Sequence, residues 1–377
     1  MKPEPTSLTT AFPRAAIAHE WLTIPGGSEK VVVELLDMLP EAEVFTSVYD
    51  VETWRETLAG RTVHASFLDR IPGARRSYSK LLPLMNAAFE SFDLSDFDLV
   101  VSSSHSCAKN VLTHPGTLHV CYCHTPMRHA WEPRFLANEP LSAPAAFAAR
   151  LLLGRLRRDD LAGASRPDLY VANSRHVQAR IAKYYRRDAR VIHPPVEVDV
   201  HLRRPRDPGD YYLVLGRVVP YKRVDLAVAA CSMLRRPVKV AGTGRAIDAA
   251  RAAAGPGSEF LGYVPDDELG DLLAGARALL FPGEEDFGIV PVEAQAAGVP
   301  VIAYSGGGAR DSVIDGETGV FCEAQTVASL CAAILRFEDR TFDEAALRDN
   351  ARRFGPERFR SEMGELLGEQ ARLRAEA

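Results

Sequence analysis

Short apolar runs alternate with stretches of helical periodicity along most of the chain. Runs that read as strands lie in the first half at residues 15–22, 98–104, 118–123, 168–173 and 190–193. The second half is more regular, with runs at residues 211–216, 238–241, 259–261, 278–281, 301–304 and 319–321. Strands that are apolar throughout and joined by helices are typical of parallel sheets covered on both faces. The pattern therefore predicts an α/β protein.

The first strand leads into a turn and an amphipathic helix. The turn contains Gly26 and Gly27, and the helix carries an apolar face of Val31, Val32, Leu35, Leu36 and Leu39. Ser28 belongs to the residue types that favour helix starts, so we expect it to cap this helix. The two glycines would let the loop approach a ligand closely, although a plain tight turn has the same composition.

The length of the chain, 377 residues, exceeds the usual size of a single core and favours two domains. Pro194 and Pro195 hold the chain extended between the two halves and form a candidate hinge. We expect two doubly wound Rossmann-like domains facing each other across a cleft, with ligand at the carboxyl ends of the strands. The expected parts are a flexible tail at residues 1–13, domains at 14–196 and 197–353, and a C-terminal helix at 354–377 that packs back toward the N-terminal domain.

Composition narrows the function classes. The net charge of −5 gives no reason to expect a nucleic acid partner. Residues 1–13 contain three prolines and no apolar segment of the signal-peptide type, and no window approaches the ~20 apolar residues of a membrane span. We therefore expect a cytoplasmic protein. The six cysteines are scattered without a CxxC pair and are interpreted as buried, reduced thiols.

Two common phosphate-binding motifs are missing. The Gly26-Gly27 turn is not part of a GxGxxG sequence, and Gly242-Thr243-Gly244 lacks the third glycine of that motif. A Walker A sequence is also absent. These absences disfavour a nicotinamide-dependent oxidoreductase and a P-loop nucleotidase, so phosphate would have to be bound in another way.

The sequence EDFGIVPVE, residues 285–293, offers such a way. It follows the apolar run at 278–281, and Gly288 and Pro291 mark a helix start whose free amides attract phosphate. Glu285 and Glu293 lie eight residues apart across this turn and could hold the hydroxyls of a nucleotide sugar.

Two basic residues follow the strand at 211–216. Arg217 and Lys222 could converge on a pyrophosphate, the first as a bidentate fork and the second as a point charge. A solvated first turn of a helix is the alternative. The predicted helix start at Gly288, whose free amides could also bind phosphate, favours pyrophosphate binding by Arg217 and Lys222.

At this point the chain resembles the retaining glycosyltransferases of family four, which have the GT-B fold. The resemblance rests on VLGRVVPYKRVD, EDFGIVPVEAQAAGVPVIAY and GGGARDSVIDGETGVF. The N-terminal blocks HEWLTIPGGSEKV, VSSSHSCAKNV, CYCHTPMRHAW, ANSRHVQARI and VIHPPV resemble the branch that builds bacterial surface polysaccharides, in which mannosyltransferases are common. The resemblance to the family covers roughly residues 17–359.

The resemblance implies a role for each donor-side residue. Glu285 would contact the hydroxyls of the donor sugar and Glu293 the ribose, while Arg217 and Lys222 would bind the diphosphate. Further donor-side residues would be Gly26, Gly27, Gly242, Gly244, Val264, Asp286, Phe287, Gly288, Ile289 and Val290. Val264 would lie near the base, and Asp286 would touch the sugar or face water.

In the N-terminal half, the resemblance places His124 near the donor sugar and the reaction centre. A satisfied histidine at a strand end is the alternative. Four further residues lie in blocks expected to line the acceptor side, namely His105, Lys109, Arg128 and Trp131. We expect no metal, because the ten histidines lack ligand spacing and no Asp-x-Asp sequence stands at a strand end.

The expected reaction is transfer of a hexose from a nucleotide diphosphate sugar to a hydroxyl acceptor, in polysaccharide, glycolipid or glycosylated natural product biosynthesis. GDP-mannose is the first donor candidate, and the acceptor could be lipid-linked. The family is thought to retain configuration by a front-face route, in which the leaving phosphate helps to deprotonate the acceptor. Two alternatives stay open: a sugar-nucleotide epimerase or phosphorylase of the same fold, and a non-catalytic nucleotide-sugar-binding module.

Two basic amphipathic stretches could hold the protein at the inner face of a membrane. In one, Leu151, Leu152, Leu153 and Leu156 alternate with Arg150, Arg155, Arg157 and Arg158. In the other, Arg75, Arg76 and Lys80 precede Leu81, Leu82, Leu84 and Met85. Such segments can lie on an anionic surface, but a core or interdomain helix with a solvated basic face has the same pattern.

Overall fold

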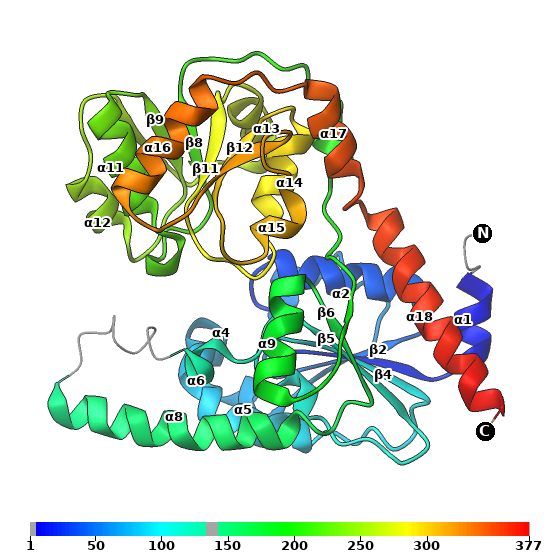
Figure 1. The fold of residues 1–377 in the computed structure, drawn as a ribbon. Helices are drawn as coiled ribbons and strands as arrows, with labels where there is room; N and C mark the ends of the chain where they lie inside the picture. The colour runs from blue at the N-terminus through cyan, green and yellow to red at the C-terminus, as the bar shows by residue number, and fades with distance from the viewer. Residues whose placement is uncertain (1–4, 133–141, 377) are drawn as a thin grey trace. The chain divides into compact units, whose positions relative to one another are not determined.

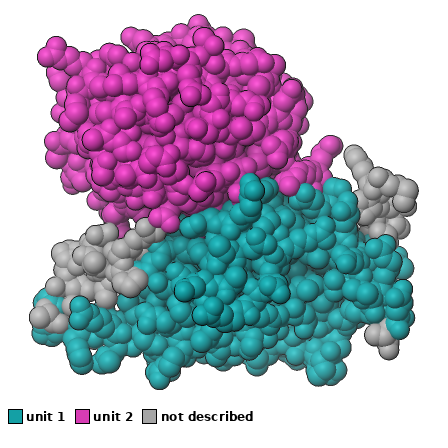
Figure 2. All heavy atoms as spheres, in the orientation of Figure 1, with its two compact units in different colours: residues 1–194, 359–377 teal, residues 195–358 magenta. Residues whose placement is uncertain are grey.

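A computed structural model describes residues 5–132 and 142–376. The chain forms two compact units, of which unit 1 comprises residues 1–194 and 359–377 and unit 2 comprises residues 195–358 (Figure 2). The first division falls between Pro194 and Pro195, the two prolines singled out in the sequence. The second falls between Arg358 and Phe359, five residues beyond the expected boundary at 353/354. The reason is that a single helix, α18 (Pro356–Glu376), runs through this boundary.

Unit 1 is built on a seven-stranded sheet in the order β3-β2-β1-β4-β5-β6-β7, and all its strand pairs are parallel (Figure 1). The strands are β1 (Ala15–His19), β2 (Glu43–Thr46), β3 (Val63–Ala65), β4 (Leu99–Ser104), β5 (Leu118–Cys123), β6 (Leu169–Ala172) and β7 (Arg190–Val191). The sequence pattern did not predict β2 and β3. Both are short, and β3 is a partly exposed edge strand without an apolar run.

The α-helices of unit 1 are α1 (Pro5–Ala11), α2 (Gly27–Met38), α3 (Val51–Trp54), α4 (Ala74–Ser77), α5 (Leu82–Glu90), α6 (Arg128–Trp131), α8 (Ala143–Gly163), α9 (Arg175–Tyr185) and most of α18. The 3-10 helices are η1 (Phe67–Arg70), η2 (Tyr78–Leu81) and η3 (Ala108–Asn110).

Part of the expected loose tail is ordered as α1. Leu8 of this helix and Phe12, which directly follows it, are both buried. They belong to the same core cluster as Phe359 and Met363 of α18.

Unit 2 is built on a six-stranded parallel sheet in the order β10-β9-β8-β11-β12-β13 (Figure 1). Its strands are β8 (Tyr212–Leu215), β9 (Val238–Ala241), β10 (Ser258–Gly262), β11 (Ala278–Phe281), β12 (Val301–Tyr304) and β13 (Gly319–Cys322). Its helices are α10 (Asp199–Leu202), η4 (Pro220–Lys222), α11 (Val224–Leu234), α12 (Ile247–Ala252), α13 (Asp266–Ala274), α14 (Ile289–Ala296), α15 (Ala309–Ser312), α16 (Val327–Glu338) and α17 (Glu344–Arg352). Every strand expected in this half is present.

Both sheets have the strand order of a doubly wound α/β fold, which confirms the predicted fold class for each unit. Apolar clusters cover both faces of each sheet. The strand order reverses beside β1 and β4 in unit 1, and beside β8 and β11 in unit 2. Ligands of such folds bind at the carboxyl ends of the strands at this switch point. Each unit therefore has one position where a ligand site is expected.

Candidate functional site

The switch point of unit 2 contains a pocket between the ends of β8 and β11. It is lined by Val214, Leu215, Gly216, Arg217, Lys222, Val224, Leu280, Phe281, Pro282 and Glu285. The apolar members end the two strands, and the charged members follow in the loops. The structure thus brings together Arg217, Lys222 and Glu285, three of the four residues predicted to be catalytic.

Lys222 and Glu285 form the closest charged contact in this pocket. The ammonium nitrogen of Lys222 lies 2.9 Å from Oε1 of Glu285, and the two side chains are only 15% and 18% exposed. The contact does not meet the angles of a hydrogen bond, since Oε1 has no aligned donor. It is thus a close ion pair with unused hydrogen-bonding capacity on the carboxylate. Arg217 is exposed at the rim.

Backbone geometry fixes the position of Lys222. It ends η4, and the next residue, Arg223, adopts a left-handed conformation with φ of 52°. The guanidinium of Arg223 then donates two hydrogen bonds to Asp225, of 3.2 and 3.0 Å, so this neighbouring charge is paired within its own helix start. A Cβ atom on Gly283 would lie 2.7 Å from Cα of Lys222, so glycine is required there for the two loops to meet.

Gly242 and Gly244 allow the loop after β9 to pack on the loop after β8. An added Cβ would lie 1.9 Å from the carbonyl oxygen of Gly216 at the first position and 2.3 Å from that of Val218 at the second. Their φ values of 143° and 154° also suit glycine. In the structure, these two predicted donor-binding residues therefore pack against the backbone on either side of Arg217.

The loop that carries Glu285 is held from its other side by a second glycine turn. Gly308 donates a backbone hydrogen bond of 2.8 Å to the carbonyl of Glu285. A Cβ atom on Gly308 would lie 2.1 Å from the carbonyl oxygen of Asp286, and one on Gly307 would lie 2.5 Å from that of Glu285. These two glycines belong to GGGARDSVIDGETGVF, and sequence analysis gave them no site role.

Helix α14 begins after Gly288, which has a φ of 92°, as the sequence pattern predicted. The side chain of Phe287 is buried in an apolar cluster, so only its backbone is left for a ligand. Ile289 and Val290 form the first turn of the helix, and Glu293 follows in the second turn, half-buried. Glu293, Asp286 and Val264 are not among the residues that line the pocket. Their predicted donor contacts remain predictions.

In unit 1, the corresponding switch point is filled by a side chain that sequence analysis missed. Glu20 follows β1 directly and is fully buried. Its carboxylate accepts backbone hydrogen bonds of 2.7–3.1 Å from residues 105–108, which follow β4, and one of 2.9 Å from the hydroxyl of Ser104. The sequence did contain a signal for this role, since Glu20 is an acidic residue directly after the first buried strand.

These hydrogen bonds keep Glu20 charged. Burial alone would raise the pKa of its carboxyl group, but His105, the amides of Cys107 and Ala108 and the charge of Lys109 outweigh burial and lower it. The amide nest of unit 1 therefore already holds an anion.

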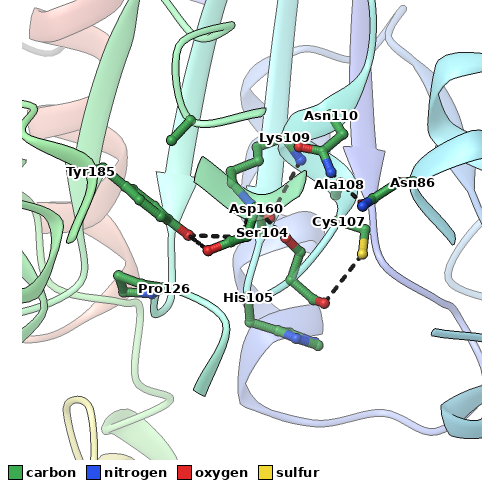
Figure 3. Close-up of polar contacts among 12 residues, drawn as sticks. Asn86, Ser104, His105, Cys107, Ala108, Lys109, Asn110, Pro126, Asp160 and Tyr185 are labelled. Carbon is green, nitrogen blue, oxygen red and sulfur yellow. Dashed lines mark hydrogen bonds and ion pairs between the residues drawn. The ribbon is translucent and has the colours of Figure 1, made fainter. Parts of the chain in front are cut away.

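Lys109 lies in a buried network with Asp160 and Tyr185 (Figure 3), which Trp131 joins from its edge. The ammonium group of Lys109 donates to the carbonyl of Ser106 at 2.6 Å and pairs with Asp160. Asp160 also accepts hydrogen bonds from Trp131, at 2.6 Å, and from Tyr185. Lys109 is only 1% exposed, so it holds the fold together and does not take the acceptor-lining position expected from the sequence. Two predicted acceptor-side residues, His105 and Arg128, remain half-buried.

His124 directly follows β5 and is almost fully buried, beside two other histidines. Its Nε2 lies 2.8 Å from the hydroxyl of Ser103, and Nδ1 of His19 lies 3.1 Å from the same hydroxyl. Burial, followed by the neighbouring His105 and His19, lowers the pKa of His124 well below its usual value, so the ring is neutral.

The Gly26-Gly27 turn is shaped by Glu29. A Cβ atom on Gly26 would lie 2.9 Å from Oε2 of Glu29. Ser28 does not cap α2, contrary to the expectation; α2 begins at Gly27, and the hydroxyl of Ser28 donates 2.8 Å to Glu29 instead. The reason is that Gly26 takes the cap position, so Ser28 lies two residues further on, inside the helix.

Within residues 5–132 and 142–376, no group of three or more His, Cys, Asp or Glu side chains is arranged to hold a metal ion. Within the same ranges, no helix has the length and apolar character of a membrane span. The six cysteines are all buried and free, as expected.

Comparison with known proteins identifies the family of both halves. The model described as "Glycosyltransferase Family 4" matches residues 25–200, and the one described as "Glycosyl transferases group 1" matches residues 203–354. The chain is similar to the glycogen synthase of Mycobacterium tuberculosis (strain ATCC 25618 / H37Rv), with 38% identity over 161 residues that cover 40% of this chain and 38% of the relative.

It is also similar to a GDP-mannose-dependent alpha-(1-6)-phosphatidylinositol monomannoside mannosyltransferase of Mycolicibacterium smegmatis. The two are 30% identical over 218 residues, which cover 49% of this chain and 55% of the relative. The chain thus spans about half or less of the length of these curated relatives.

Among solved structures, the fold is similar to that of HepE from Anabaena in complex with UDP and glucose. The TM-score is 0.65 at 17% identity, and the match covers 94% of this chain and 99% of the other. This likeness shows a shared fold. The two family models, which together match residues 25–200 and 203–354, show that the chain belongs to glycosyltransferase family four, whose GT-B fold the structure has.

Proposed function

We propose that the protein transfers a sugar from a nucleotide diphosphate sugar to a hydroxyl acceptor, with retention of configuration. The observation that carries the proposal is the pocket at the switch point of unit 2, where an ammonium and a carboxylate lie 2.9 Å apart. A sugar diphosphate has anionic and hydroxyl groups next to each other, so this pair is complementary to it.

Lys222 and Arg217 bind the diphosphate in this proposal. They stabilise the negative charge that develops on the nucleotide as the glycosidic bond breaks. Glu285 accepts hydrogen bonds from sugar hydroxyls, for which its unaligned Oε1 leaves capacity. Glu293 binds the ribose, and the backbone of Phe287, Gly288, Ile289 and Val290 adds amide donors.

Retention follows from the proposed division of roles. A double displacement would need a carboxylate below the anomeric carbon. Glu285 and Glu293 are instead assigned to hydroxyl binding, and His124 is assigned to the donor sugar. The proposed route is therefore front-face transfer, in which the leaving phosphate accepts the proton of the acceptor hydroxyl.

Mannose from GDP-mannose is the first donor we propose. The support is the printed name of the Mycolicibacterium smegmatis relative, which is GDP-mannose-dependent. The Anabaena neighbour is described in complex with UDP and glucose, so UDP-glucose is the second probe.

The decisive experiment combines binding with product analysis. A thermal-shift panel of GDP, UDP, GDP-mannose and UDP-glucose should identify the donor, since a ligand that binds the folded state raises its apparent stability. With that donor and a panel of hydroxyl acceptors, NMR should show a glycosylated product with the anomeric configuration of the donor. An epimer or a sugar phosphate as the product, or an inverted anomeric centre, would contradict the proposal.

We also propose that transfer needs no metal ion, because Lys222 and Arg217 supply the positive charge. Prior treatment with EDTA should leave the rate of transfer within about twofold of the untreated rate. A loss restored by Mg²⁺ or Mn²⁺, and not by Ca²⁺, would overturn this point.

The acceptor-side partner that we propose is an anionic lipid surface, contacted through α8. Phe147 and Leu151 are each 63% exposed on this helix, and Arg150, Arg155 and Arg158 are exposed with them. Leu153 and Leu156 instead face the core of unit 1. Figure 1 shows that the first half of α8 extends beyond the strands of unit 1. Exposed apolar and basic side chains on one helix suit the headgroup region of a bilayer.

A further inference from the structure

Four buried side chains of unit 1 form a continuous polar series that ends at His124. Oε1 of Glu29 lies 3.3 Å from Nε2 of His19. Nδ1 of His19 lies 3.1 Å from both the carbonyl oxygen and the hydroxyl of Ser103. The hydroxyl of Ser103 then lies 2.8 Å from Nε2 of His124. The series therefore connects the start of α2 to the end of β5 through β1 and β4.

The chemistry of the partners determines where the protons lie on His19. Burial would raise the pKa of Glu29, but hydrogen bonds from His19 and Ser28 lower it to about 2, so Glu29 is a carboxylate that can only accept. The carbonyl of Ser103 can also only accept. The imidazole of His19 lies between these two acceptors, and its Nδ1 must donate to Ser103 because a carbonyl oxygen has no proton to give.

The proton of Ser103 then has a single acceptor. Because Nδ1 of His19 carries a proton, it has no lone pair to offer the hydroxyl, which can donate only to Nε2 of His124. A neutral histidine that accepts at Nε2 carries its proton at Nδ1. Within the described part of the chain, the structure gives Nδ1 of His124 no hydrogen-bond partner, and this nitrogen is not among the buried unsatisfied atoms. It is the ring nitrogen left for a ligand.

We propose that Glu29, His19 and Ser103 are positioning residues that hold His124 as the Nδ1–H tautomer, so that it donates a hydrogen bond to an oxygen of the bound donor sugar. The inference rests on the proposed function for the identity of the ligand, but the tautomer itself does not depend on it. It assigns His124 a donor role and excludes it as the base that deprotonates the acceptor, since its one lone pair faces Ser103.

The tautomer can be measured directly on the full-length protein without a ligand. Two-bond ¹H–¹⁵N correlation spectra of histidine-labelled protein at neutral pH should show Nδ1 of His124 protonated and Nε2 unprotonated. Ser103→Ala removes the donor to Nε2 and should shift the population toward Nε2–H. Ser102→Ala is the matched control, because Ser102 is a buried serine of the same strand that contacts His119 at 2.9 Å instead. An Nε2–H tautomer in the unsubstituted protein would overturn the inference.

A second measurement tests the role toward the sugar. Glu29→Gln keeps the shape of the side chain but removes the carboxylate that orients the ring of His19, so the hydroxyl of Ser103 can turn away from His124. Both Glu29→Gln and Ser103→Ala should weaken binding of the nucleotide sugar by about fivefold, the worth of one hydrogen bond, and leave binding of the nucleoside diphosphate unchanged. GDP-mannose against GDP, and UDP-glucose against UDP, are the probe pairs.

The outcomes separate the two proposals. An equal loss for sugar and diphosphate forms, or no loss for either while the tautomer changes, would overturn the positioning role. If the unsubstituted protein binds none of these nucleotides, the proposed function fails, whereas the NMR result still decides the tautomer. If Ser103→Ala does not fold, Glu29→Gln and the unsubstituted protein carry the test.

Discussion

At the scale of single residues, the candidate site reduces to a lysine and a glutamate with different expected contributions. Lys222 would bind the diphosphate, which is present in nucleotide and nucleotide sugar alike. Glu285 would bind only the sugar. Their side chains are only 15% and 18% exposed, so the removal of one partner leaves a largely buried charge without its counter-ion and should also lower the stability of the fold.

We therefore predict that Lys222→Ala and Glu285→Ala each lower kcat for transfer by about two to three orders of magnitude, the range seen when one group that stabilises developing charge is removed. Lys222→Ala should also weaken binding of the nucleoside diphosphate, whereas Glu285→Ala should weaken only that of the nucleotide sugar. Calorimetric titration and initial rates would measure both effects.

Glu284→Ala is the matched control for this prediction. Glu284 is the adjacent acid and does not line the pocket, so its removal should leave kcat within about threefold of the original value. Near-normal turnover in Lys222→Ala or Glu285→Ala, with an unchanged thermal unfolding curve, would count against the proposed site.

Sequence reasoning found Lys222 and Glu285 of unit 2 but missed the buried polar residues of unit 1, and the reason is physical. Lys222 and Glu285 stand in the loops that follow two buried apolar runs, so local pattern places them beyond the carboxyl ends of β8 and β11. Glu20, His19 and Ser103 depend on β1 and β4 lying next to each other, which is a tertiary contact between residues 84 positions apart. For Lys109 the prediction of an acceptor-side role was wrong. The sequence around this charged residue gives no sign that it is buried in an ion pair with Asp160.

At the scale of elements, the loops around the site are held by backbone packing that only glycine permits. The turn at Gly307 and Gly308 approaches the loop of Glu285 so closely that a methyl group cannot be inserted. The elements themselves were largely predictable, because most strands of unit 2 are short apolar runs, and only β9 and β10 include a charged residue. The missed strands β2 and β3 are short, and they form by pairing, β2 with β1 and β3 with β2.

We predict that Gly308→Ala displaces the loop of Glu285 and raises KM for the donor at least about fivefold, with a loss of stability of about 1–3 kcal/mol from overpacking. The added Cβ would start 2.1 Å from the carbonyl oxygen of Asp286. Donor titration and thermal unfolding would measure the two effects.

Gly257→Ala is the control in the same unit. Gly257 has a φ of 90°, but its added Cβ would lie 3.6 Å from the nearest atom, so the substitution introduces backbone strain without a clash. It should lower stability and leave KM unchanged. A normal KM in Gly308→Ala would show that the glycine turn does not position Glu285.

At the scale of the whole molecule, buried histidines make stability depend on pH. Burial, with a contribution from Arg166, lowers the pKa of His119 from 6.5 to about 3. The unfolded chain therefore binds a proton that the folded chain refuses between these pH values, so stability falls as pH falls below 6.5.

We predict a loss of about 2 kcal/mol from His119 alone between pH 6.5 and about pH 5, measured as a fall in apparent Tm. In His119→Gln, the apparent Tm should fall less over the same interval. His114→Gln is the control, because His114 is an exposed loop residue that solvent reaches in both states. The same Tm decrease in His119→Gln and in the original protein would contradict the assignment.

Membrane contact is the other property of the whole molecule that the structure makes testable. We predict that the protein floats with liposomes containing anionic phosphatidylglycerol and not with neutral phosphatidylcholine liposomes, and that moderate salt releases it. Replacing Arg150, Arg155 and Arg158 with Gln should abolish flotation. Replacing Arg235, Arg251 and Arg352, exposed arginines of unit 2, should leave it unchanged. Equal binding to both liposome types would contradict an electrostatic contact.

Glu20 shows how one side chain can divide labour between two similar folds. Both sheets have the same order of strands around the switch point, so the fold alone would give each unit an anion-binding position there. In unit 1 the backbone amides at this position already donate to the carboxylate of Glu20. The occupied amide nest of unit 1 therefore favours unit 2 as the half that receives the proposed nucleotide.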